Sequence, residues 1–435
     1  MKNISFAIII HTKNRSWTFR KTIESISRFY SKDDSVTVIV VDDSSCKISQ
    51  AENKKILLES NLLKVWYVDS DRWQEVKRLA AFYFFEDENA LLDKISLGEP
   101  AWNTHNTRNI GKLLLVSTKI ADISLFLDDD MVLLKKLKLP FDFDKSQVPV
   151  WGLKLSGCPD LTRLEWVQLY LASHQKHLYI PNKTDKTLDA EYIDCLISEL
   201  SMEKIYELVI QYTDFSINNK ATTKKTLINS DKLPQRLRIS GGAYICRVDD
   251  ADVSSFPMWY NEDWNWFDMI IRKYNRDQQF NFKLANPVFL DDYIVHNADK
   301  KKVLDLDLML FEEHGKICLK LSKCLAENLE LKEEDYSMIL QERVEELNSI
   351  LNQINLLTNN SITKNHDYEI KKIFQVINLT LEKLLNQDKQ LYKNALTNFS
   401  QSNLIWQFIT DKLKYSTQLG KHEQWQKILE ETLKI

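Results

Sequence analysis

The first 130 residues contain four short apolar runs, and segments with helical periodicity separate them. The runs span residues 5–12, 36–42, 62–68 and 123–127. Continuous apolar runs of this length are typical of strands buried on both faces of a parallel sheet. After Ser16, apolar side chains recur at the spacing of an amphipathic helix, at Phe19, Ile23, Ile26 and Tyr30. This alternation of strand and helix predicts an α/β fold with a doubly wound, mostly parallel sheet.

The character of the chain changes twice after this first segment. Aromatic and helical stretches dominate between about 135 and 235, and an apolar run with paired glycines follows at 236–248. Beyond residue 301 the chain reads as amphipathic helix with almost no glycine or proline. We therefore predict two halves of one α/β domain, the second with a helical insertion, and an all-α C-terminal domain. Their predicted ranges are 1–134, 135–300 and 301–435.

Polar side chains follow each predicted strand directly. They occupy residues 11–15, 42–45, 69–71 and 128–130, and the last group is three consecutive aspartates. In doubly wound sheets, ligands bind outside the carboxyl ends of the strands. We therefore expect the active site at this edge of the sheet.

The turns between the predicted strands and helices lack the glycines that commonly bind phosphates. The sequence has neither a GxGxxG after the first strand nor a GxxxxGK[ST] motif, which argues against a dehydrogenase or a P-loop enzyme. A divalent cation held by carboxylates is the other common way to neutralise a diphosphate. Carboxylate and diphosphate oxygens favour Mg²⁺ or Mn²⁺, so the three aspartates are predicted to hold one of these ions and part of a nucleotide.

Composition narrows the partners and the compartment. The net charge is −4 with acidic and basic residues interspersed, which argues against a nucleic-acid partner. The six cysteines form no CxxC pair and are read as reduced thiols. No apolar run reaches the length of a membrane-spanning segment. A cytoplasmic protein without a transmembrane segment is expected.

Six motifs, in order, resemble those of GT-A fold glycosyltransferases, in particular the family-2 branch. They are IIIHTKNR, VIVVDDSS, NTRNIG, FLDDDM with the DxD pattern, SGGAY, and NEDWNW with the xED pattern. A later YIVHN resembles the terminal histidine motif of related branches, and together the motifs span roughly residues 5–297. The C-terminal helices lie outside the resemblance. It implies a nucleotide-sugar-binding half over 1–134 and an acceptor-binding half over 135–300.

The resemblance implies a role for each motif. Asp263 is expected to be the general base that deprotonates the acceptor, and Glu262 to assist it. The residues expected to bind the nucleotide sugar are His11, Arg15, Asp42, Asp43, Arg108, Asp128 and Asp129, with Asp43 favoured as the partner of uracil. The expected metal ligands are Asp130, Asp128 and His296, and the expected acceptor contacts are Trp259, Trp264 and Gly242.

Several of these residues also have an ordinary structural explanation. Asp42 and Asp43 could cap the next helix, Arg108 could lie on a helix surface, and His296 could be a structural histidine. Acidic residues in a first helical turn, such as Glu262 and Asp263, are favoured by the helix dipole in any protein. The bulky aromatic residues around these two acids nevertheless suit the apolar face of a sugar.

The sequence thus predicts a metal-dependent inverting glycosyltransferase with a UDP-sugar as the expected donor. The acceptor is a glycan, a protein or a small molecule, and the C-terminal helices are expected to mediate self-association or acceptor docking. One alternative is a retaining GT-A enzyme, which would carry the same DxD and histidine. A sugar nucleotidyltransferase would normally have a glycine-rich loop after the first strand, which is missing here. A non-catalytic carbohydrate-binding protein is disfavoured by the acids at every strand end.

Overall fold

The protein is described here from a computed structural model. The described residues are 5–33, 35–85, 89–98, 103–137, 150–158, 242–250, 254–260, 262–276, 288–297, 306–326, 331–359, 367–418 and 421–435. The helical insertion predicted before residue 235 lies outside these described parts.

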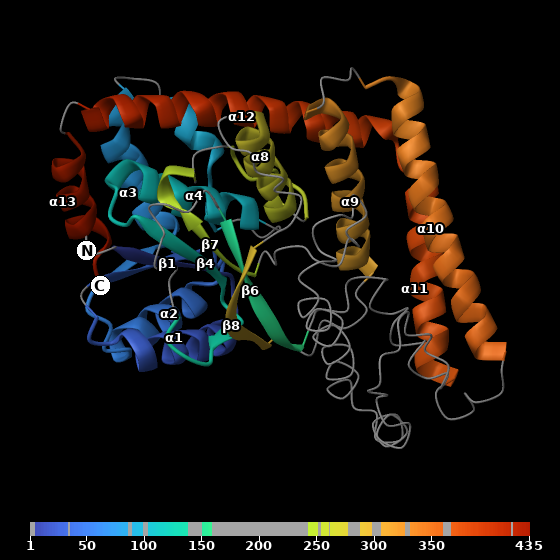
Figure 1. The fold of residues 1–435 in the computed structure, drawn as a ribbon, viewed down its shortest axis with the longest axis horizontal. Coiled ribbons are helices and arrows are strands. Elements are labelled where there is room, and N and C mark those ends of the chain that lie inside the picture. The colour runs from blue at the N-terminus through green and yellow to red at the C-terminus, as the bar shows by residue number, and fades with distance from the viewer. Residues whose placement is uncertain are drawn as a thin grey trace.

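An eight-stranded sheet forms the centre of the described fold, in the order β3-β2-β1-β4-β7-β6-β8-β5 (Figure 1). Four strands, β3, β2, β1 and β4, pair in parallel, whereas β7 pairs antiparallel with both β4 and β6. The strand bounds are β1 Phe6–Thr12, β2 Val36–Asp42, β3 Val65–Val68, β4 Ile123–Asp128, β5 Met131–Leu133, β6 Val150–Cys158, β7 Ala243–Arg247 and β8 Val288–Asn297. The four runs predicted as buried strands are therefore the parallel half of this sheet.

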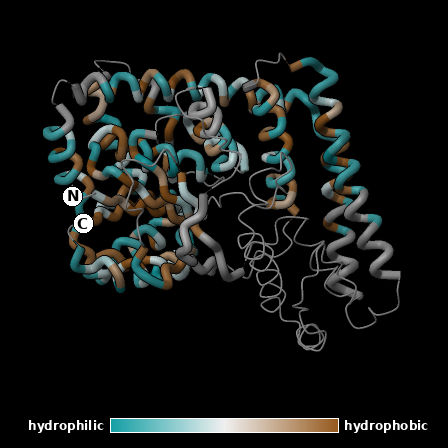
Figure 2. Tube along the Cα trace, viewed as in Figure 1, coloured by the Kyte–Doolittle hydropathy of each residue, from teal (hydrophilic) through white to brown (hydrophobic). Residues whose placement is uncertain are grey.

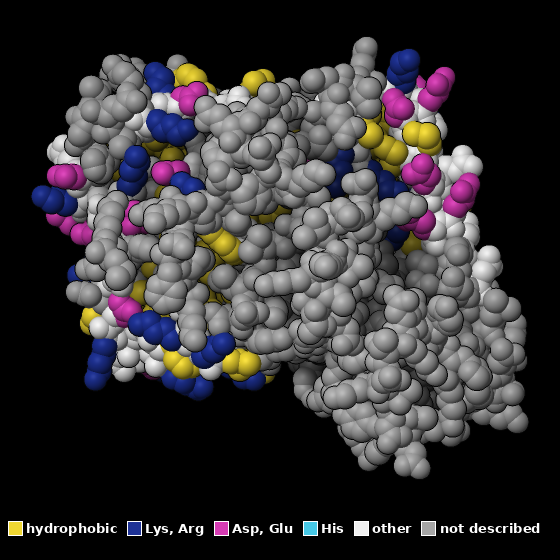
Figure 3. Space-filling model, viewed as in Figure 1, with side chains coloured by type: hydrophobic (Ala, Val, Ile, Leu, Met, Phe, Trp, Pro, Cys, Tyr) yellow, Lys and Arg dark blue, Asp and Glu magenta, His cyan; other side chains and the backbone are white. Residues whose placement is uncertain are grey.

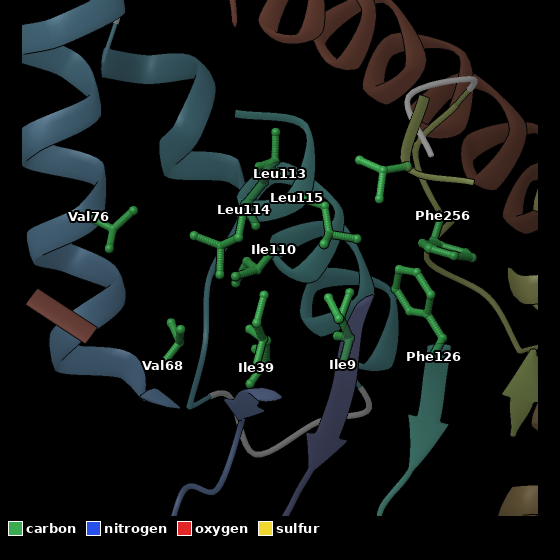
Figure 4. Packing of buried hydrophobic residues seen from close by; sticks show 14 of the residues in the cluster. Ile9, Ile39, Val68, Val76, Ile110, Leu113, Leu114, Leu115, Phe126 and Phe256 are labelled. Carbon is green, nitrogen blue, oxygen red and sulfur yellow. The ribbon is translucent and has the colours of Figure 1, made fainter. Parts of the chain in front are cut away.

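Helices cover both faces of the parallel half. Successive strand residues point to opposite faces, so Ile8 and Ile10 pack toward α1 (Ser16–Tyr30) and α2 (Lys47–Glu59). Ala7 and Ile9 pack toward the helices of the other face. These are α3 (Ser70–Ala80) and α4 (Thr104–Thr118), with α8 (Glu262–Arg276) farther along the sheet. Figure 4 shows this second cluster, with Ile9, Ile39 and Val68 of the strands facing Ile110 and Leu114 of α4.

Five C-terminal helices follow the sheet. Their bounds are α9 Leu306–Ala326, α10 Glu333–Asn359, α11 Asp367–Leu385, α12 Lys389–Gln418 and α13 Lys421–Leu433. Helices α9 to α11 and the first half of α12 pack around their own hydrophobic cluster. Helix α12 then runs back across α4, and α13 packs on α3, α4 and β3 (Figure 1). In Figure 2, brown hydrophobic segments predominate in the central strands and alternate with teal hydrophilic segments along the helices.

The second half of α12 and helix α13 share a hydrophobic core with the sheet. Trp406, Trp425, Leu429 and Leu433 are buried in the same cluster as the strand and helix residues of the first 130 positions. The chain near its C-terminus also joins the sheet edge, where Ile435 N donates to the carbonyl of Val65 at 3.2 Å. Residues on both sides of position 301, the predicted boundary, therefore contribute to this core.

The predicted fold class is confirmed: an α/β, doubly wound and mostly parallel sheet is followed by an all-α C-terminal region. Among the described helices, none is both long and apolar enough to cross a membrane. Acidic and basic side chains of described residues are interspersed along the left-hand side of the molecule in Figure 3.

Candidate active site

The carboxyl ends of β1, β2 and β4 meet at one edge of the sheet. The strand register sets His11 of β1 beside Asp128 of β4, and Thr12 of β1 beside Asp42 of β2. The polar residues that follow these strands therefore come together in space, at the edge where the sequence pattern predicts a ligand site.

The middle aspartate of the acidic turn, which comprises residues 128–130, is held in place by buried polar contacts. Asp129 is fully buried, accepts a hydrogen bond from Thr12 Oγ1 at 2.7 Å and is paired with Arg15. Its backbone carbonyl accepts a further bond from Thr22 Oγ1 of α1 at 2.8 Å. Burial raises the pKa of Asp129 to about 7 although Arg15 opposes that effect. Asp129 therefore ties the turn to β1 and α1, and its predicted contact with the nucleotide has no support in this arrangement.

The two flanking aspartates are placed differently. The side chain of Asp128 is 26% exposed and lies beside His11 and Arg108, with Arg108 Nη2 at 3.2 Å from its Oδ1. Asp130 is nearly buried and accepts from Arg15 Nη1 at 2.9 Å. Burial would raise the pKa of Asp128, but the charges of His11 and Arg108 outweigh it and hold that pKa below its usual value. Asp128 is therefore the most accessible carboxylate of the turn.

His11 also belongs to this group of charged and polar side chains. It is buried, and its Nε2 contacts Oδ1 of Asp128. Burial lowers the pKa of His11; Asp128 opposes this change, and the guanidinium groups of Arg108 and Arg15 add to it. The Nε2–H of His11 can donate to Asp128 in this position, and so hold that carboxylate at the strand end.

Gly242 lies where a side chain would collide with the acidic turn. Its carbonyl accepts from the backbone N–H of Asp128 at 2.9 Å. A Cβ at this position would come within 2.2 Å of Met131 Cε and within 3.1 Å of Asp128 Oδ2. The glycine before β7 therefore permits close approach of the two chain segments. It supports the site by shaping the turn, whereas the sequence suggested an acceptor contact.

The two acids after β2 have separate environments. Asp42 is fully buried and accepts from Asn53 Nδ2 at 2.9 Å and from the hydroxyl of Tyr67 at 2.6 Å. Asp43 accepts instead from Lys13 Nζ at 2.7 Å, and from Asn103 Nδ2 at 3.0 Å. Asp42 thus belongs to an internal network beneath the edge. Asp43 belongs to the group of polar residues at the strand ends.

Arg108 joins the two halves of the site. From α4, its Nη2 lies 3.2 Å from Asp128 Oδ1 and its Nε lies 3.1 Å from Glu262 Oε1 of α8. The guanidinium also lies over the ring of Phe256, at 5.7 Å. Burial works against the charge of Arg108, but Glu262 and Asp128 outweigh it and hold the pKa of the guanidinium above its usual value. One side chain therefore connects the acidic turn with the first turn of α8.

Glu262 and Asp263 begin α8, as the sequence predicts, and both are buried. Burial raises the pKa of Glu262 to about 8; Arg108 opposes this change, and Asp263 adds to it by repulsion. Two adjacent buried carboxyl groups beside a single guanidinium are a costly arrangement for stability alone. Such clusters of shifted acids are more typical of functional sites than of hydrophobic cores.

The aromatic residues around α8 divide between two hydrophobic cores. Trp259 is buried and packs edge-on against Phe399 of α12, with ring centroids 5.0 Å apart. Trp266 is buried in the core of the α/β part, whereas Trp264 is only partly buried and packs against that core. The position of Trp259 does not fit its expected contact with an acceptor. Trp264 is the better placed of the two predicted acceptor residues.

A divalent metal can be tested against the residues present. Asp128 and Asp130 offer the hard oxygen donors that Mg²⁺ and Mn²⁺ prefer. The backbone of His296 in β8 pairs with Met131, directly after Asp130, while its side chain lies outside the described atoms. Within the described part of the chain, no group of three metal-ligating side chains is assembled. The donor set fits a metal whose shell is completed by a ligand such as a diphosphate.

Several residues of this edge were not singled out from the sequence. Lys13 and Asn103 both bind Asp43, and Thr12 binds Asp129. Lys112 of α4 is completely buried, one helical turn after Arg108. A lysine beside Leu113 and Leu114 on an apolar helix was the available signal for Lys112. Residues 12, 13 and 103 gave no signal beyond their position next to a strand or helix end.

Comparison with known proteins gave similarity only at the level of structure. No protein-family model matches the chain, and no curated protein matches it. The structure is similar to the mannosyltransferase PcManGT from Pyrobaculum calidifontis in complex with GDP-Man and Mn²⁺, with 10% identity, a TM-score of 0.42, and coverage of 87% of this chain and 86% of that one.

Two further solved structures are similar. TarS residues 1–349 from S. aureus, in complex with UDP-GlcNAc, shows 14% identity, a TM-score of 0.34, and coverage of 95% of this chain and 92% of that one. Core-mannan synthase A from Aspergillus fumigatus, in its Mn/GDP form, shows 13% identity, a TM-score of 0.26, and coverage of 61% and 64%. Similarity at this level assigns neither substrate nor mechanism, so the function is argued below from the site itself.

Proposed function

We propose that this chain is a metal-dependent, inverting GT-A glycosyltransferase that moves a sugar from a nucleotide sugar to a glycan, protein or small-molecule acceptor. The observation that carries the proposal is the position of Arg108, 3.2 Å from Asp128 and 3.1 Å from Glu262. The carboxylate that would face the donor and the helix that would face the acceptor are thereby held within the span of one guanidinium.

The donor would bind at the strand ends. Asp43 would accept the imino N–H of uracil in place of the Lys13 ammonium that it binds now, which favours a UDP-sugar. Asp128 and Asp130 would hold Mn²⁺ or Mg²⁺, with His296 as a further ligand. When bound, the ion would neutralise charge on the diphosphate. Arg108, which remains charged, would lie close to the same diphosphate and add to this stabilisation.

The acceptor would bind beside the first turn of α8. Its hydroxyl oxygen would form a bond to the anomeric carbon while the bond from that carbon to the diphosphate oxygen breaks. The nucleoside diphosphate leaves with the bonding electron pair, and the hydroxyl proton passes to the carboxylate of Asp263. Glu262, bound to Arg108, would orient the pair and contact the acceptor, with Trp264 close by on the same helix.

The test is release of nucleoside diphosphate from a panel of UDP- and GDP-sugars, with and without Mn²⁺. We expect turnover with at least one UDP-sugar, lost when Mn²⁺ is chelated and in Asp130→Ala. The exposed Asp307 on α9 gives a matched control, because Asp307→Ala removes a carboxylate that pairs with Lys383 of α11 and is not part of the strand-end group. Absence of turnover across the whole panel, or unchanged Mn²⁺-dependent turnover in Asp130→Ala, would contradict the proposal.

A further inference from the structure

The segment before α8, residues 254–256, is held between α4 and the C-terminal helix α12 by contacts that we call the clamp. Asn109 of α4 accepts from the backbone N–H of Phe256 at 2.9 Å and donates to its carbonyl at 3.3 Å. From the other side, Asn403 Oδ1 of α12 accepts from the N–H of Ser255 at 2.9 Å and from its hydroxyl at 2.8 Å. Two amide side chains thus bind both backbone polar groups of Phe256 and the backbone N–H of Ser255.

A fully buried lysine of α4, Lys112, belongs to the same clamp. Lys112 donates to the carbonyl of Ser254, and its ammonium lies over three aromatic rings. The distances from Nζ to the ring centroids are 4.2 Å for Phe256, 4.3 Å for Trp406 and 5.2 Å for Trp266. A lysine is almost never completely buried unless it is compensated. Here the rings come from three parts of the chain, so the cation joins α4, α8 and α12.

This clamp is directly connected to the proposed catalytic acids. Phe256 packs against Trp266 of α8, with centroids 5.2 Å apart, and Arg108 lies over the ring of Phe256. Glu262 and Asp263 follow Phe256 by only a few residues and begin the helix that carries Trp266. A shift of residues 254–256 would therefore be passed to both carboxylates. Figure 1 shows α12 running above α4 and α8.

We propose that Asn403 and Lys112 are positioning residues. Through them, the C-terminal helix α12 holds the carboxyl groups of Glu262 and Asp263 at a fixed position relative to the donor site. This inference rests on the proposed glycosyltransferase function. The contacts described for Asn403 and Lys112 are with residues 254–256, Trp266 and Trp406, and these lie on the acceptor side of Arg108. Loss of the clamp should thus lower kcat and leave nucleotide binding unchanged. A misplacement of about 1 Å at reacting groups can cost about 10²-fold in rate.

The experiment compares two nearly isosteric variants of the full chain. Asn403→Leu removes the oxygen that accepts both bonds from Ser255, whereas Asn403→Asp keeps an acceptor oxygen there. Turnover is measured as release of UDP from the preferred UDP-sugar with Mn²⁺, together with UDP affinity and the thermal midpoint. We expect Asn403→Leu to lose about 10- to 100-fold in kcat, with KM for the donor and UDP affinity unchanged. Asn403→Asp should recover most of the loss.

Three results would overturn the inference: normal kcat in Asn403→Leu, equal losses in both variants, or a loss of UDP affinity as large as the loss in kcat. If Asn403→Leu does not fold, Ser255→Ala removes one of the two bonds with a smaller volume change, and the same criteria apply to it. Failure of the parent enzyme to turn over any nucleotide sugar would refute the proposed function itself, and the inference with it. Normal turnover in parent and variants refutes the positioning role alone.

Discussion

Arg108 lies between two carboxylates that belong to different parts of the sheet. Asp128 closes the parallel half and Glu262 begins a helix beyond the antiparallel strand β7, yet both lie within 3.2 Å of one guanidinium. The charge of Arg108 favours the ionised form of either acid, and the ionised Asp128 keeps Arg108 in place. Burial nevertheless raises the pKa of Glu262 to about 8. The relative position of the reacting groups of the proposed transfer therefore depends on Arg108 as well as on the contacts that hold residues 254–256.

The sharpest prediction at this scale concerns Asp263. Asp263→Asn keeps the size of the side chain but removes a proton acceptor, an effect worth about 10²–10⁴-fold in rate. We expect transfer to fall by that amount, with UDP binding unchanged because the nucleotide contacts other strand ends. Asp268→Asn, five residues later on the same helix, at a carboxylate that pairs with Lys323 of α9, is the matched control.

Product stereochemistry gives an independent check on the same residue. An inverting enzyme forms a product with the anomeric configuration opposite to that of the donor, as determined by NMR of the freshly formed product. A product that retains the donor configuration would favour the retaining alternative. Substantial transfer by Asp263→Asn would show that Asp263 is not the general base.

Glu262 leads to a prediction about stability and pH. Its pKa is raised from an ordinary 4.5 to about 8 in the folded protein, by burial against the opposing charge of Arg108 and with repulsion from Asp263 and Asp128. Between these values the folded state keeps a proton that the unfolded state releases. Stability from this group is therefore complete below pH 4.5 and declines as pH rises toward 8, by up to about 1.4 kcal/mol per pH unit.

Urea unfolding of the parent and of Glu262→Gln at pH 5 and pH 8 measures this effect. The glutamine does not titrate, so the variant should gain stability relative to the parent as pH rises. Glu334→Gln on the exposed surface of α10 is the control and should show a constant difference. A constant difference for Glu262→Gln as well would show that the carboxyl is not held protonated.

At the scale of elements, the turn from β4 to β5 and the start of β7 fit together only because residue 242 lacks a side chain. Gly242→Ala would bring a methyl group to 2.2 Å from Met131 Cε, and Met131 is itself buried. We expect a loss of about 1–3 kcal/mol in the free energy of unfolding, as for other overpacked sites. Turnover should also fall, because the same methyl group would press on Asp128.

A double-mutant cycle with Met131→Ala tests the cause. If the collision with Met131 explains the loss, the double variant should be more stable than the sum of the single effects, by about 0.5–3 kcal/mol. Additive effects would place the cost elsewhere, for instance in the contact with Asp128 Oδ2.

The arrangement of the parallel half could be predicted from sequence because the apolar runs specify strands on their own. Val38, Val40 and Ile8, for example, are buried whatever helix covers them. The environments within the acidic turn could not be predicted, since three adjacent aspartates look alike in sequence. Their difference arises from Thr12 and Arg15, which are more than a hundred residues away and reach Asp129 only once the sheet has formed.

The C-terminal helices show the same limit. An amphipathic pattern indicates that a helix has a buried face but does not name its partner. From the sequence, Trp259 could equally stack on a sugar or belong to the core. The periodicity of hydrophobic residues alone does not decide between these two roles. Contact with Phe399, 140 residues later in the chain, is what makes Trp259 a core residue.

At the scale of the whole molecule, α12 and α13 are part of the α/β core. Trp406, Trp425, Leu429 and Leu433 are all buried there, and burial of such side chains stabilises by about 1.5–3 kcal/mol each. Removal of residues 386–435 would therefore cost about as much as the total stability of a typical protein. We expect the truncated chain to lack a cooperative unfolding transition and to lose UDP binding.

Point variants test the same claim without truncation. Trp406→Ala should lose about 3–5 kcal/mol, whereas Leu404→Ala, two residues earlier and exposed, should change stability by less than about 0.5 kcal/mol. A truncated chain that unfolds cooperatively and binds UDP would instead support an independent domain after residue 301. Self-association through the C-terminal helices stays a prediction.

The outer edge of β3 is closed by residues from the far end of the chain. Arg72 donates to the carbonyl of Leu433, 361 positions later, and Trp66 forms an isolated β-bridge with Lys434. At synthesis rates of about 5–20 residues per second, roughly 20–70 s separate the appearance of these partners on the ribosome. During that interval the edge of β3 is unpaired, and unpaired edges are where nascent chains associate with one another. Slower synthesis therefore lengthens the period of exposure, and yield of the folded protein should depend on how this edge is protected before Leu433 emerges.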